Sequence, residues 1–170
     1  MRWNWGKIIT AIGFVALTIG AIDPMEGSLL ILPGSGLIAL GAYLEKAEPD
    51  RFRFRLWMFL LILFGVGSLF IISWMGGIGG ESQPSLWWGV LFLPYLMGWS
   101  LSIWAKDSPK WVIWGGMLVC LWYFAILYMA LSGWFPNRSL EMLLAPIILS
   151  ALGLLTLIGC IWRLNHQKLA

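Results

Sequence analysis

Apolar residues run along this chain in six long segments, and short stretches between them hold most of the charged residues. The apolar segments cover about residues 5–22, 28–44, 56–75, 85–105, 111–134 and 140–162. A helix that crosses a bilayer needs roughly 20 predominantly apolar residues. The connections are rich in glycine, proline and charge, as expected for turns. The pattern predicts an all-α integral membrane protein, a six-transmembrane-helix bundle in which residues 1–170 form a single membrane domain.

The composition supports a membrane protein. Hydrophobic residues make up 60% of the 170 residues and charged residues only 11%, whereas soluble domains carry about 25% charged residues. Six spans leave no room for a separate soluble domain. The net charge is only +3, so a basic surface for nucleic acid is not indicated. The expected partner is the lipid bilayer.

Lysine and arginine gather at alternate connections. Ten of them would lie on one side of the membrane: Arg2, Lys7, Lys46, Arg51, Arg53, Arg55, Lys106, Lys110, Arg163 and Lys168. Arg138 alone would lie on the other side. Because cytoplasmic loops carry an excess of basic residues, both termini are predicted to be cytoplasmic. The expected location is a plasma membrane of the bacterial (inner) type.

The longest charged passage, residues 45–55, reads Glu-Lys-Ala-Glu-Pro-Asp-Arg-Phe-Arg-Phe-Arg. Its three arginines, Arg51, Arg53 and Arg55, are the predicted topology anchor. Alternating arginine and phenylalanine beside a span also suits docking on anionic headgroups. However, acidic residues in the same passage leave it with a net charge of only plus one, so the anchor is favoured.

The thirteen tryptophans mostly fall near the ends of the predicted spans. Trp111 and Trp162 lie near the predicted cytoplasmic ends, and Trp74 and Trp134 near the outer ends. An amphipathic indole ring suits the headgroup region. These residues therefore predict two interfacial belts.

The residues that carry chemistry are sparse. The centres of the predicted spans contain no Asp, Glu, Lys, Arg or His, the residue types that mark proton relays and ion pathways. The single histidine, His166, follows the last span, and a transition-metal site needs several ligands together. We therefore predict no catalytic residue, no metal site and no cofactor.

Four acidic residues lie on the predicted outer face: Asp23, Glu26, Glu81 and Glu141. Short connections between neighbouring spans bring them to one side, so together they are candidate ligands for a cation. The alternative is that they are solvated loop carboxylates, two of them placed favourably near helix N-termini.

Three prolines lie in the outer halves of even-numbered segments: Pro33, Pro94 and Pro146. They are candidate kink positions, which would loosen three helices around an outward-facing cavity. The alternative is that proline is simply tolerated in early helical turns.

These features favour a non-enzymatic accessory or assembly subunit of a membrane complex, bound to other membrane-protein subunits or to copies of itself. The alternative is a small transporter or channel for a neutral or lipidic solute, motivated by the prolines and by hydroxyl residues within the spans. A membrane enzyme is the third class, and the sequence leans against it.

Overall fold

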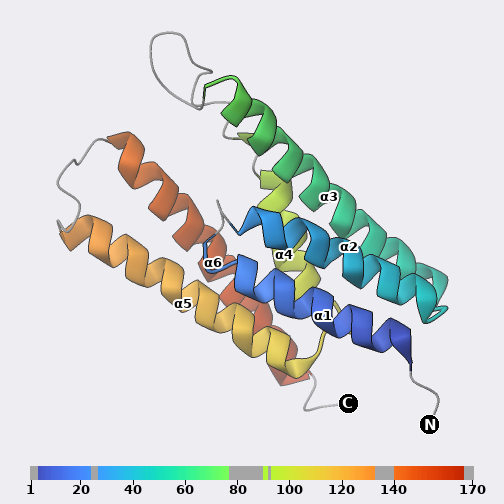
Figure 1. Cartoon of the computed structure of the whole chain (residues 1–170). Helices are drawn as coiled ribbons and strands as arrows, with labels where there is room; N and C mark the ends of the chain where they lie inside the picture. Colours follow the sequence, from blue (N-terminus) through green and yellow to red (C-terminus); the bar gives the residue numbers. More distant parts are fainter. Residues whose placement is uncertain (1–3, 24–26, 77–89, 92, 133–139, 167–170) are drawn as a thin grey trace. The chain divides into compact units, whose positions relative to one another are not determined.

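The computed structural model of the chain describes residues 4–23, 27–76, 90–91, 93–132 and 140–166, with side chains in the last range described for residues 147–165. Six α-helices account for most of these residues (Figure 1): α1 (Trp5–Gly20), α2 (Ser28–Leu44), α3 (Pro49–Trp74), α4 (Leu93–Trp104), α5 (Lys110–Ser132) and α6 (Leu140–His166). The all-helical prediction is confirmed.

Three of these helices have the length and apolar composition to cross a membrane. They are α3, α5 and, within α6, Ile147–Asn165. Two further apolar helices, α1 with 16 residues and α2 with 17, are shorter. At 1.5 Å per residue each is about 24–26 Å long, somewhat less than the roughly 30 Å hydrocarbon core. The chain is a small helical membrane protein.

The chain forms two compact units, residues 1–102 and 103–170. The first contains α1, α2, α3 and most of α4. The second contains the last two residues of α4, followed by α5 and α6.

In the first unit, α1 and α2 pack side by side along a seam of glycines (Figure 1). A Cβ atom added at Gly13 would lie 2.6 Å from the carbonyl oxygen of Gly34, and one added at Gly41 would lie 2.8 Å from that of Gly6. Gly20 faces Gly27 in the same way. Glycine at each position lets the two antiparallel backbones approach closely, as small residues do in membrane helix pairs.

In the second unit, α5 and α6 are also neighbours, and Ser150 of α6 donates a hydrogen bond to the carbonyl oxygen of Tyr123, at 3.2 Å. The indole of Trp104 lies on α6, where its Nε1 donates to the carbonyl oxygen of Thr156 at 3.2 Å. Cys120 and Cys160 are both buried and carry free thiols. Side-chain donors of this unit therefore bond to backbone carbonyls of neighbouring helices.

Some helix boundaries differ from the predicted segments. Helix α3 begins at Pro49, not near residue 56, because proline suits the first helical position and Asp50 in the first turn interacts favourably with the helix dipole. Helix α6 continues past residue 162 to His166. The described helix α4 has 12 residues, fewer than the predicted 85–105, of which residues 85–89 and 92 lie outside the description.

Candidate functional site

The charged passage at residues 45–55 is largely helical, and the helix sorts its three arginines. Arg51 and Arg55 are four residues apart, so they lie on one face of α3. Arg53 lies on another face and is exposed. Arg51 is 34% exposed, whereas Arg55 is only 2% exposed. The candidate site of the first unit is therefore the face that carries Arg51 and Arg55.

Arg55 is held by two other helices of its unit. Its Nη1 donates to the carbonyl oxygen of Ser102, at 3.0 Å. Its guanidinium carbon lies 5.0 Å from the ring centroid of Phe14 in α1 and 5.9 Å from that of Phe54. The last carbonyls of a helix have no partner within the helix, and a cation over an aromatic face is attracted electrostatically. Arg55 thus connects α3 to the C-terminal end of α4 and to α1.

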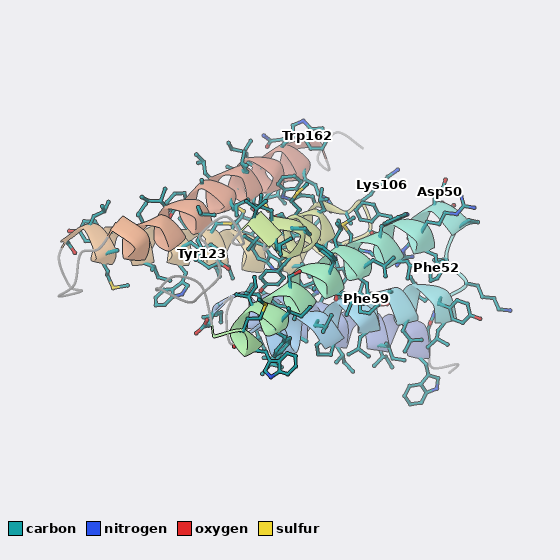
Figure 2. The ribbon with its side chains drawn as sticks, turned by 90° about the horizontal axis from the view of Figure 1, so that it is seen from above. Asp50, Phe52, Phe59, Lys106, Tyr123 and Trp162 are labelled. Atoms are coloured by element: carbon teal, nitrogen blue, oxygen red, sulfur yellow. The ribbon has the colours of Figure 1, made fainter. Side chains whose placement is uncertain are left out.

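A second polar contact lies where α2 ends. Glu45, the residue after α2, forms an ion pair with Arg51 at 3.3 Å, and the side chain of Glu45 is only 10% exposed. The hydroxyl of Thr10 in α1 donates to the other carboxylate oxygen of Glu45, at 3.4 Å. Figure 2 shows Asp50 and Phe52 at this end of α3. Residues from α1, α3 and the α2–α3 connection meet here on one carboxylate.

The second unit also has a buried arginine. Arg163, on the last turns of α6, is 5% exposed. It donates to the carbonyl oxygens of Ile103 at 3.2 Å, Lys106 at 2.6 Å and Ser108 at 3.3 Å. These carbonyls belong to the end of α4 and to the α4–α5 turn, residues 105–109. A single guanidinium, with five donors in a fixed fork, holds that turn against α6.

The sequence did not indicate these roles for Arg55 and Arg163. Each lies next to an apolar segment, where a basic residue is expected to face the headgroups. The only available signal was register: α3 begins early enough to place Arg55 on the face of Met58 and Ile62, both of which are buried. The prediction that these residues act in topology stays a prediction, because burial in the folded chain does not test it.

The four outer-face acids are described only in part. Asp23 is exposed, and its carboxylate interacts electrostatically with the buried Tyr95 of α4. Glu26 and Glu81 lie outside the described residues, as does the side chain of Glu141. The cation-ligand prediction therefore remains a prediction. Among the described side chains, no group of three or more His, Cys, Asp or Glu residues is arranged to hold a metal ion.

The prolines divide similarly. Pro33 lies inside α2 on its exposed side, and the helix continues through it. Pro94 is the second residue of α4 and is half-buried, a position that proline tolerates well. The side chain of Pro146 lies outside the described residues. The kink positions likewise remain predictions.

Arg55 and Arg163 have contacts that stabilise the fold. The two buried guanidiniums bond to backbone carbonyls of their own units, and a guanidinium stays protonated at physiological pH, so it does not shuttle protons. Comparison with known proteins adds no family or activity: no protein-family model, no curated protein and no solved structure matches this chain.

Proposed function

We propose that this chain is a non-enzymatic accessory or assembly subunit of a membrane protein complex. The observation that carries the proposal is the use of the two buried cations. Arg55 and Arg163 donate to the carbonyls of Ser102, Ile103, Lys106 and Ser108, so they hold helix ends. Buried charges in membrane proteins are functional candidates by default, and here both have a structural explanation.

The outer surface supports the same proposal. Large apolar side chains are exposed along the helices, for example Leu118 at 67% and Tyr128 at 73% on α5, and Leu29 at 65% on α2. Lipid covers such surfaces, and neighbouring membrane helices pack against them by van der Waals contact. The connection between α2 and α3 is only four residues long, which leaves little chain there to bind a soluble ligand.

The proposal includes the finer topology. Six spans in a single membrane domain, both termini in the cytoplasm and a plasma membrane of the bacterial type agree with the distribution of lysine and arginine. In this arrangement the α2–α3 connection and the α4–α5 turn face the cytoplasm.

Purification at native abundance tests the proposal. The chain, tagged at its genomic locus, is extracted in a mild detergent and sized by native electrophoresis, and its stoichiometric companions are identified by mass spectrometry. We expect a complex well above the 19.1 kDa of the chain plus its detergent, containing at least one other membrane protein. A parallel extraction in a harsh detergent should release the free chain.

Two outcomes would contradict the accessory role. A monodisperse chain with no companion in mild detergent is one, and an oligomer that contains this chain alone is the other. If the purified chain then moved a neutral solute or a lipid across proteoliposomes, the transporter would replace the subunit.

A further inference from the structure

The α4–α5 turn of the second unit is held by hydrogen bonds from Arg163 of α6. Three carbonyl oxygens of the end of α4 and of the turn accept hydrogen bonds from this one side chain. The turn therefore has a fixed backbone, and the partial negative charges of these carbonyls are directed toward the buried guanidinium. The side chains that the turn presents outward decide what it can bind.

Those side chains are basic. Lys106, in the turn, and Lys110, the first residue of α5, are both exposed. The acidic residue of the turn, Asp107, is half-buried and interacts electrostatically with Arg163. Lys106 and Lys110 are therefore the exposed charged side chains of residues 105–110.

The charged face of the first unit differs. There the acidic residues Glu45, Glu48 and Asp50 accompany Lys46, Arg51 and Arg53, and Arg51 is paired with Glu45. Arg55 adds no surface charge because it is buried. At that face three acidic side chains therefore accompany the three basic ones that remain at the surface, whereas residues 106–110 carry two exposed lysines and one half-buried acid, Asp107.

Two exposed tryptophans are sequence neighbours of residues that form or hold the turn. Trp111 follows Lys110 on α5 and is 45% exposed, and Trp162 precedes Arg163 on α6 and is 62% exposed. Figure 2 shows Trp162 projecting outward from its helix. Indole rings prefer the headgroup depth of a bilayer, so we expect the two lysines to lie at the level of lipid phosphates.

We infer that the α4–α5 turn binds the headgroup of an anionic phospholipid, with the phosphodiester between Lys106 and Lys110 and the lipid chains beside Trp111 and Trp162. Lysine residues close to a membrane surface are attracted to anionic headgroups. The inference rests on the membrane location of the chain, and it holds or fails independently of the accessory role.

Native mass spectrometry of the full-length chain, in micelles that contain either phosphatidylglycerol or phosphatidylcholine, tests the site. The unmodified chain is expected to retain phosphatidylglycerol preferentially. The double variant Lys106→Gln/Lys110→Gln should weaken this retention about 10- to 30-fold, the effect expected for two basic residues at a membrane surface. Lys106→Arg/Lys110→Arg should restore it.

The matched control is Lys7→Gln/Lys46→Gln, which removes two exposed lysines of the first unit and should leave retention unchanged. Thermal melting of every variant shows that each is folded. Equal loss in the control and in the turn variant would overturn the inference, as would equal retention of phosphatidylcholine. The inference would also be overturned if inorganic phosphate displaced bound phosphatidylglycerol as effectively as added phosphatidylglycerol does. The turn would then be a site for free anions.

Discussion

The guanidinium of Arg55 lies 5.0 Å from the ring centroid of Phe14, in the second half of helix α1. The charge is therefore inside the first unit, over an aromatic face, although its position in the sequence is at the edge of an apolar segment. The hydrogen bond to Ser102 supplies a carbonyl acceptor from α4. Three helices that are far apart in the sequence converge on this one cation.

Arg55→Gln should destabilise the first unit. The substitution removes the cation from Phe14 and leaves the buried carbonyl of Ser102 without this donor, and a hydrogen bond to a charged group contributes about 1.5–3 kcal/mol. We expect a clearly lower melting temperature in detergent. The control is Arg53→Gln, which removes the same charge from an exposed position and should shift melting little. Equal shifts in both variants would show that Arg55 contributes only its charge.

The helical fold, with a described helix in each of the six apolar segments, could be predicted from the sequence, because long apolar runs are typical of membrane helices. The start of α3 could not, since the charged passage resembles a loop until Pro49 and Asp50 are recognised as the first turn of a helix. The burial of Arg55 follows from that start. Because the helix already includes Arg55, this residue lies on the same face as the buried Met58 and Ile62. Arg163 likewise follows the last predicted segment, 140–162, whereas α6 continues through it.

The glycine seam is a feature that sequence analysis could have found. Gly6, Gly13, Gly20, Gly27, Gly34 and Gly41 follow one another at intervals of seven residues. An interval of seven keeps residues near one face of a helix. Because α1 and α2 are antiparallel, Gly20 faces Gly27, Gly13 faces Gly34 and Gly6 faces Gly41. Which helix they would face could not be predicted, because spacing alone does not identify a partner.

Gly13→Ala should loosen the α1–α2 pair. The added methyl group would lie 2.6 Å from the carbonyl oxygen of Gly34, and backbone cannot move aside as a flexible side chain does. Overpacking of this kind costs about 1–3 kcal/mol. Thermal melting and protease sensitivity in detergent measure the effect.

The matched control for the seam is Gly67→Ala in α3, where an added Cβ has nothing within 4 Å. Alanine forms helices better than glycine by about 0.8–1.0 kcal/mol in soluble hosts. This variant should therefore melt no lower than the unmodified chain. If Gly13→Ala behaved like Gly67→Ala, the close approach of α1 and α2 would not contribute to stability.

Arg163→Gln should release the α4–α5 turn. The three carbonyls of Ile103, Lys106 and Ser108 lose a common donor. Amide hydrogen exchange over residues 105–110 is expected to rise, while exchange in α1 and α2 stays unchanged. Asn165→Ala, at an exposed position of the same helix, is the control and should leave the turn protected. Unchanged exchange in Arg163→Gln would mean that the turn is held by other contacts.

If residues 51–55 set the topology, replacing all three arginines should have a different effect from replacing Arg55 alone. Orientation is decided during insertion, when all three arginines of residues 51–55 act by their charge. Arg51→Gln/Arg53→Gln/Arg55→Gln should therefore disturb orientation, whereas Arg55→Gln alone should destabilise the fold and keep the orientation, because most of the basic residues remain. Reporter fusions after Lys46 and after Gly76 measure the two sides separately.

Arg138→Gln, which removes the one basic residue predicted on the opposite side, is the control and should leave the location of both reporters unchanged. If the triple variant gave the same reporter sides as the unmodified chain, the three arginines would serve the folded structure and would not set its direction in the membrane.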